Sequence, residues 1–189
     1  SAVDWTPTAT NQAGGVQLSQ GSEIIGALRT RQEILIWTDV GIVSMRFVGE
    51  PFIFSFTEVG EGASLIGPNA AVSANNRVYF MDVGGFYSYS GSAEKIPCTV
   101  LDYVLSDLNQ DQSFKVFAAV NNIANEIMWF YPSGTNTEID KYVLYNYLEN
   151  VWSIGTTDDG FVRTAWDQAS ILEYPIAASK NDSSNLNYV

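Results

Sequence analysis

Two stretches decide the fold that we predict for this chain of 189 residues: Ile34-Leu35-Ile36-Trp37-Thr38-Asp39-Val40-Gly41 and Arg77-Val78-Tyr79-Phe80-Met81-Asp82-Val83-Gly84. Each joins an apolar strand to an Asp-Val-Gly turn, and the second turn follows the first after 43 residues. A period of about 40–45 residues is typical of a four-stranded propeller blade. The sequence therefore predicts an all-β chain built from β-propeller-like blades.

Around these turns we expect units of four antiparallel strands, because short apolar or alternating runs are separated by polar and glycine-containing breaks. The expected strands are 24–29, 33–38, 42–48 and 52–58, then 70–74, 77–81, 85–90 and 95–98, then 114–120, 126–131, 141–147 and 151–154. Asn75-Asn76 is expected to form a compact hairpin turn. A fourth unit begins near Tyr174 and continues through 186–189. About four blades are expected.

The last unit is expected to lack its outer strands, and an uncovered strand edge invites association. Two explanations stay open. In the first, residues 2–19 supply the missing strands and close the ring. In the second, residues 1–189 form a single β-propeller-type domain that is a fragment or core of a larger protein. A short distance between the terminal strands would favour closure.

One short helix is expected at residues 99–109, inserted between the second and third units. Thr99 is the expected N-cap, with Asp102 as its partner in a capping box. The helix would pack against the outer rim of the blades or against a neighbouring subunit. Its apolar side chains form one stripe: Val100, Leu101, Val104, Leu105 and Leu108.

The composition is globular and acidic. Nine basic and 21 acidic residues leave a net charge of −12, which argues against wrapping duplex DNA or binding an anionic membrane. No stretch has the apolar length that spans a bilayer, so no membrane partner is expected. Cys98 is the single cysteine and cannot form an internal disulfide.

The residue types argue against a reaction centre. The sequence has no histidine, which removes the commonest general base, the Ser-His-Asp triad and most zinc sites. Asp39 and Asp82 occupy equivalent positions, where a ring of carboxylates is one interpretation. The favoured interpretation is a hairpin turn in which Asp bonds its own backbone and Gly takes a positive φ. Segments 158–160 and 181–185 lack the EF-hand spacing and are interpreted as turns. We predict no catalytic, cofactor or metal residue, and no enzyme.

Two aromatic runs, 129–131 and 142–147, have the ring types that stack on sugars or unpaired bases. Packing is the favoured interpretation. Tyr145 and Tyr147 share one face of the expected strand, while Tyr142 and Leu144 share the other, so at least one set is expected in the core.

Seven short segments spread over nearly the whole chain carry a resemblance: Asp4-Trp5-Thr6-Pro7, Glu33-Ile34-Leu35-Ile36-Trp37-Thr38-Asp39, Gly67-Pro68-Asn69-Ala70-Ala71, Pro97-Cys98-Thr99-Val100, Trp129-Phe130-Tyr131-Pro132, Val143-Leu144-Tyr145-Asn146-Tyr147 and Arg163-Thr164-Ala165-Trp166. They resemble tail proteins of marine tailed bacteriophages. More distantly, the pattern is similar to the propeller-bearing nozzle and packaged-DNA stabilisation proteins of short-tailed phages. These motifs are structural, and the resemblance carries over no catalytic residue.

The resemblance implies a structural virion component that forms a ring beneath the portal and adaptor. Its implied partners are other tail proteins and copies of itself, with DNA only as passing cargo. Its implied location is the virion tail, after a soluble stage in the host cytoplasm. We therefore expect a nozzle-type protein whose copies form a channel that retains and conducts DNA.

Two other classes stay open. The first is a carbohydrate-binding or glycoside-cleaving propeller that recognises a host surface polysaccharide. Cleavage would require two carboxylates about 5 to 10 Å apart, and we look for them in one concave pocket with a solvent-facing Trp. The second is a plain interaction scaffold in a cellular complex.

Overall fold

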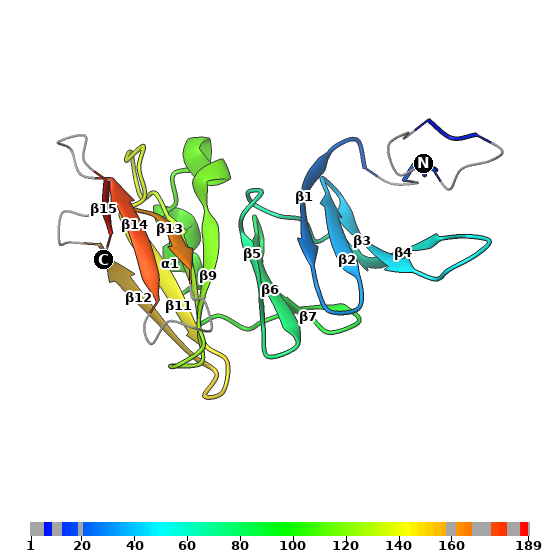
Figure 1. Ribbon diagram of the computed structural model, residues 1–189. Coiled ribbons are helices and arrows are strands. Elements are labelled where there is room, and N and C mark those ends of the chain that lie inside the picture. Colours follow the sequence, from blue (N-terminus) through cyan, green and yellow to red (C-terminus); the bar gives the residue numbers. More distant parts are fainter. Residues whose placement is uncertain are drawn as a thin grey trace.

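The computed structural model describes residues 6–8, 13–18, 21–157, 162–167, 175–180 and 186–188. These residues form four antiparallel sheets in which each strand pairs with the next along the chain (Figure 1). The sheets comprise β1 (Ile24–Arg29), β2 (Ile34–Thr38), β3 (Gly41–Phe47) and β4 (Phe54–Glu61); β5 (Ala71–Ala74), β6 (Arg77–Asp82), β7 (Gly85–Tyr89) and β8 (Ala93–Lys95); β9 (Phe117–Asn121), β10 (Glu126–Tyr131), β11 (Lys141–Asn146) and β12 (Val151–Thr156); and β13 (Val162–Asp167), β14 (Ile176–Lys180) and β15 (Leu186–Tyr188). The prediction of an all-β fold with about four blade-like units is confirmed.

The strand positions differ from the prediction by more than two residues in four places. The strand expected at 95–98 is β8, which ends at Lys95. The strand expected at 114–120 is β9, which begins at Phe117 because Phe114 and Lys115 belong to a 3-10 turn. The fourth sheet begins at β13, not near Tyr174, and β13 pairs with β14 in the register Trp166↔Ala177. β4 runs from Phe54 to Glu61 instead of 52–58. It starts later because Ile53 has φ 25°, outside the strand region, and its carbonyl accepts a hydrogen bond from the Val48 amide (2.9 Å), which closes the β3–β4 hairpin loop.

The first strands of the four sheets face a common axis. β1, β5, β9 and β13 all contribute residues to one cavity of about 310 Å³, among them Leu28, Ala71, Phe117 and Thr164. The sheets fan out from this axial cavity, and the first and last sheets lie at opposite ends of the fan (Figure 1). Their described strands do not pair with each other.

Ring closure by residues 2–19 is not seen in the described part of that segment. Residues 6–8 and 13–18 form no strand, and the rest of the segment lies outside the described residues. The described strands therefore form an open fan of blades.

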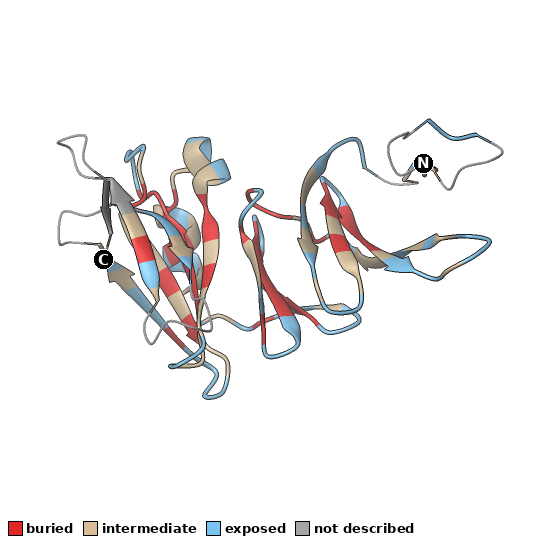
Figure 2. Ribbon diagram, viewed as in Figure 1, coloured by how far each residue is buried: buried red, intermediate tan, exposed pale blue. Residues whose placement is uncertain are grey.

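Large aromatic side chains fill the space between neighbouring sheets, where Figure 2 shows the buried positions. Trp37 of the first sheet meets Phe80 of the second edge-on, with ring centroids 5.5 Å apart. Phe86 of the second sheet contacts Trp129 and Trp152 of the third, at 4.8 and 4.7 Å. One hydrophobic cluster thus runs through the first three sheets.

Three tryptophans also bond across these boundaries through their indole N–H groups. Trp129 donates to the Ala70 carbonyl (3.1 Å), Trp152 to that of Pro97 (2.9 Å) and Trp166 to that of Val120 (3.0 Å). The indole nitrogen of Trp37 is buried without a hydrogen-bond partner. Three of these tryptophans therefore join neighbouring sheets through a hydrogen bond as well as packing, whereas Trp37 does so by packing alone.

The inserted helix α1 (Leu101–Asp107) is shorter than the predicted 99–109. The Thr99 N-cap prediction is wrong, because Val100 occupies the N-cap position and makes no side-chain capping bond. The chain then continues into a 3-10 turn, η1 (Gln110–Lys115), which Asn109 caps by accepting a hydrogen bond from the Asp111 amide (3.1 Å).

The helix packs on the chain's own core. Val104 and Leu108 are buried in the main hydrophobic cluster, and Leu101 and Leu105 pack against it. Asp107 pairs with Lys141 of β11 at 2.8 Å. The apolar stripe seen in the sequence is thus covered by the second and third sheets. No helix among the described residues is long and apolar enough to cross a bilayer.

At two glycines, Gly67 and Gly155, neighbouring atoms lie so close that an added Cβ would contact them. A Cβ on Gly67 would lie 2.9 Å from the Ser113 carbonyl oxygen and 3.1 Å from the Phe114 Cα, both backbone atoms of η1. The nearest atoms to a Cβ on Gly155 belong to the ring end of Tyr142, a partly buried side chain that packs on Phe130 and whose ring can shift at lower cost than backbone. We expect Gly67→Ala to lower the free energy of unfolding by about 1–3 kcal/mol, and Gly155→Ala by less. Urea unfolding curves compare the two, and an equal or larger loss for Gly155→Ala would contradict this account.

Candidate functional site

The two repeated aspartates sit at β2–β3 and β6–β7 turns, as the repeat predicted, but their contacts differ. Asp82 accepts a hydrogen bond from the Gly84 amide of its own turn (3.4 Å). Asp39 accepts mainly from Ser22, through its amide and its hydroxyl (2.8 Å each), and these bonds lower the pKa of Asp39. Asp39 therefore anchors the segment before β1.

The glycines of the two turns also differ from the prediction. Neither Gly41 nor Gly84 has a positive φ, whereas Gly85 has φ 138°. In the first turn the Thr38 hydroxyl accepts from the Gly41 amide (3.1 Å), so Thr38 supplies the bond expected from Asp39. No three acidic or cysteine side chains gather into a metal site among the described residues. Segments 158–160 and 181–185 lie outside them.

The aromatic runs are packing residues, as predicted. Trp129 and Tyr131 are fully buried. Tyr145 of β11 stacks on Trp152 in the main cluster, with centroids 4.5 Å apart. On the other face of β11, Tyr142 packs in a second cluster. Side chains on both faces of β11 therefore pack in hydrophobic clusters. Cys98 is partly buried, and burial raises the pKa of its thiol.

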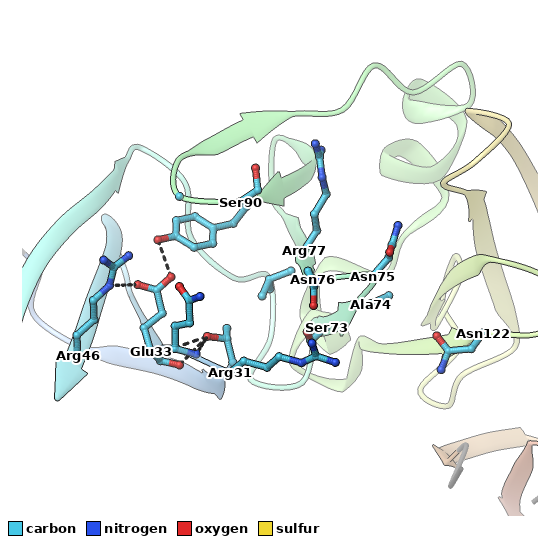
Figure 3. A pocket seen from close by; sticks show the side chains of 15 residues that line it. Arg31, Glu33, Arg46, Ser73, Ala74, Asn75, Asn76, Arg77, Ser90 and Asn122 are labelled. Atoms are coloured by element: carbon cyan, nitrogen blue, oxygen red, sulfur yellow. Dashed lines mark hydrogen bonds and ion pairs between the residues drawn. The ribbon is translucent and has the colours of Figure 1, made fainter.

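A polar groove of about 570 Å³ lies where the β1–β2, β5–β6, β7–β8 and β9–β10 turns come together (Figure 3). Sequence analysis did not identify it, because its residues come from turns far apart in the chain and no local motif marks them. The chemically distinctive residues in its lining are Arg31, Glu33, Arg46, Asn75, Asn76 and Arg77.

Glu33 is the centre of a hydrogen-bond network on one wall of the groove. Its side chain is only 8% exposed and accepts from Arg46 Nε at 2.8 Å. It also accepts from the Tyr89 hydroxyl (3.0 Å) and from the Ser44 hydroxyl. Burial raises the pKa of Glu33, but these hydrogen bonds outweigh it and leave the pKa below its usual value. Glu33 is therefore an ionised acceptor held by three donors.

The same network suppresses ionisation of Tyr89. Burial, followed by the hydrogen bond to the Glu33 carboxylate, raises the pKa of Tyr89 to about 12. The Tyr89 hydroxyl thus stays protonated and keeps donating through the neutral range. Hydrogen bonds from Arg46 and Tyr89 to Glu33 thus join these three residues into one wall of the groove.

The other two arginines of the groove, Arg31 and Arg77, lie in or next to the β1–β2 and β5–β6 turns. In the β1–β2 turn the Thr30 hydroxyl accepts from the Glu33 amide (3.1 Å), which fixes the loop that carries Arg31. In the β5–β6 turn, Asn75 and Asn76 have φ 47° and 59°, the left-handed pair of a two-residue hairpin, as predicted. Arg77 follows this turn directly. Neither Arg31 nor Arg77 forms an ion pair within the described part of the chain.

Neither described cavity has the groups that glycoside cleavage requires. The polar groove contains one carboxylate, Glu33, and no Trp. The axial cavity includes Trp37 and Trp166 but no carboxylate. The criterion of two carboxylates and a solvent-facing Trp in one pocket is not met in either.

One apolar surface stands apart from the hydrophobic clusters. We define the open face by the apolar residues on one side of the first sheet: Ile34, Ile36, Val43, Met45, Phe47, Phe54 and Phe56. Val43 is buried, Phe47 and Phe54 are exposed, and the other four are partly buried. The strand register places Arg29 and Glu58 on the same side. None of these packs in either cluster that joins the described sheets. The tip of the β3–β4 hairpin continues this face away from the other sheets (Figure 1). There Phe47 and Phe52 are 72% and 77% exposed.

The fold thus defines a class of protein, an all-β chain of blade-like sheets around an axis. The sequence matches no family model and no curated protein. A solved structure described as "AfRom2 CNH domain" is similar in fold, with a TM-score of 0.47 and 12% sequence identity. The match covers 100% of this chain and 61% of that chain, so this chain spans less than two thirds of the length of that structure.

Proposed function

We propose that this chain is a structural component of a phage tail, of the nozzle type, that works by assembly with copies of itself and with other tail proteins. The observation that carries the proposal is the open face with its exposed hairpin tip. Contiguous apolar surface of this kind marks interaction sites on folded proteins. The sequence resemblance to phage tail proteins gives the assembly its proposed setting.

The strand β2 explains why the open face needs a partner. Its first four residues, Ile34-Leu35-Ile36-Trp37, are all apolar, which is typical of a strand covered on both faces. Leu35 and Trp37 are covered by packing with the second sheet. Ile34 and Ile36 point to the open face and are only half-buried. In our proposal, a second molecule covers Ile34, Ile36 and the rest of the open face.

The proposed DNA channel lies between copies and not along the axis of one chain. The axial cavity of about 310 Å³ has room for roughly ten water molecules at about 30 Å³ each, far less than duplex DNA requires. The net charge of −12 would weaken adhesion of DNA to surfaces facing such a channel. Retention would then depend on the shape of the assembly.

Charge introduced on the open face tests the assembly. We expect the purified chain to self-associate, and Phe47→Asp combined with Phe54→Asp to abolish association at the same concentration. The two side chains are exposed, at 72% and 47%, but they are directly opposed across the hairpin with ring centroids 5.8 Å apart. The double substitution should therefore lower the free energy of unfolding by about 1–2 kcal/mol, through the lost ring contact and the repulsion of opposed carboxylates, and leave the chain folded. Sedimentation velocity measures association, and urea unfolding measures stability.

Leu148→Asp is the matched control, because Leu148 is 62% exposed in the β11–β12 turn, outside the open face. It should leave association unchanged. A wild-type chain that stays monomeric at high concentration, or equal weakening by Leu148→Asp, would contradict the assembly proposal. Immunogold labelling of purified virions tests the setting separately. If label is absent from the tail, the tail assignment fails even where self-association holds.

A further inference from the structure

The polar groove contains two positive charges without a partner in the described residues. Arg31, Arg46 and Arg77 all line it, although the whole chain has only nine basic residues. Glu33, the one carboxylate in the lining, is bound by Arg46 at 2.8 Å. Arg31 and Arg77 therefore stay uncompensated in a chain whose net charge is −12. An anion bound in the groove would compensate these charges and accept charge-assisted hydrogen bonds from the arginines.

The other residues that line the groove indicate which further groups the ligand would carry. It consists largely of amide and hydroxyl groups, from Gln32, Ser73, Asn75, Asn76, Ser90 and Asn122. Such groups both donate and accept, as sugar hydroxyl groups do. The lining has no exposed aromatic ring, since Tyr89 is only 3% exposed. A stacking platform, on which unpaired bases depend and which sugars can also use, is therefore missing, so recognition in this groove would rest on charge and hydrogen bonds.

The groove is also held in shape before any ligand arrives. The Asn75-Asn76 turn and the Glu33 network fix two of its walls, and Figure 3 shows Arg31 reaching from its turn toward that of Asn75 and Asn76. A preformed site loses less entropy on binding. Its volume of about 570 Å³ lies within the range of about 300–1,000 Å³ found for ligand pockets.

We propose that this groove binds an acidic oligosaccharide, with Arg31 and Arg77 pairing with uronate carboxylates and the amide and hydroxyl side chains bonding to sugar hydroxyls. The proposal does not depend on the open face or on assembly, and either can fail without the other. It assigns the groove a recognition role with no bond-breaking step.

The test is calorimetric titration of the whole chain with tetragalacturonate at low ionic strength. We expect saturable binding that weakens as salt is added, because the attraction is between charges. Arg31→Gln combined with Arg77→Gln should weaken binding at least about tenfold, the order expected for loss of hydrogen bonds to charged groups. Each single substitution should give a smaller loss. Lys95→Gln, an exposed lysine outside the groove lining, should have no effect.

Several results would overturn the proposal. Absence of binding would do so, as would equal binding by the double variant with an unchanged far-UV circular dichroism spectrum. Binding of neutral cellotetraose as tight as that of tetragalacturonate would remove the role of the arginines. Tighter binding of an eight-residue oligothymidylate would assign the groove to nucleic acid instead.

Discussion

Replacing Trp129 by Ala should lower the free energy of unfolding by about 3–5 kcal/mol, the range measured for truncation of large buried side chains. Trp129 is fully buried on β10 and contacts Phe86 of the second sheet, with ring centroids 4.8 Å apart. It also donates to the Ala70 carbonyl beside β5. The substitution opens a cavity at the boundary of the second and third sheets and leaves a buried carbonyl without that donor. Urea unfolding followed by far-UV circular dichroism measures the loss.

A pair of Phe variants separates the hydrogen bond from the packing. Trp129→Phe removes the indole donor that bonds to Ala70, whereas Trp37→Phe removes a buried indole nitrogen that has no partner. Both variants shrink a fully buried ring. Trp129→Phe should therefore be more destabilising, by about 1 kcal/mol, the net worth of one hydrogen bond. Equal losses would mean that the indole bond to Ala70 adds nothing to stability.

Removing the Glu33 carboxylate should give the second large effect. Glu33→Ala leaves the buried hydroxyls of Tyr89 and Ser44 without this acceptor, and we expect a loss of about 2–4 kcal/mol at pH 7. The Arg46 bond adds little to this figure, because the Arg46 side chain is 51% exposed and solvent screens the pair. Glu33→Gln keeps an acceptor oxygen and should cost less.

The contribution of Glu33 should depend on pH in one direction. Its pKa in the folded chain lies below the usual value of 4.5, so folding favours the ionised form. The stabilisation is complete above about pH 4.5 and is lost as the pH falls through the folded-state pKa. The stability difference between the wild type and Glu33→Gln should therefore shrink between pH 7 and pH 3.

Unfolding curves at pH 7, 5 and 3 measure this difference. Glu94→Gln is the control, because Glu94 is an exposed residue of β8. It should change stability by less than about 0.5 kcal/mol at pH 7. A wild-type to Glu33→Gln difference that stays constant with pH would show that the carboxylate charge does not contribute.

Local sequence patterns predicted most strands and one tight turn. Asn75-Asn76 forms the expected compact hairpin turn, in a left-handed conformation that the short polar side chain of Asn tolerates. β13 was missed, and the helix was predicted two residues too long at each end. Thr99 is not the N-cap, because the helix begins only after Val100. Where a helix begins depends on how it packs on the sheets, which local sequence patterns do not show.

The polar groove could not be predicted from local patterns. Arg31 and Arg77 belong to different hairpins, and Asn122 to a third. Only the fan of sheets around the axis brings these turns together. The hydrogen bond that Tyr89 donates to Glu33 illustrates the same limit, since the two residues lie 56 positions apart along the chain.

The sequence by itself determined most of the strands, the 43-residue period and the apolar character of both faces of β2, because these follow from side-chain periodicity along a few residues. Tertiary structure alone decided which face of the first sheet is covered and which is the open face. It also decided that the repeated Asp39 and Asp82 take different partners. Contacts between sheets depend on how whole blades pack, and equivalent positions in a repeat meet different neighbours once the fan is open at one end.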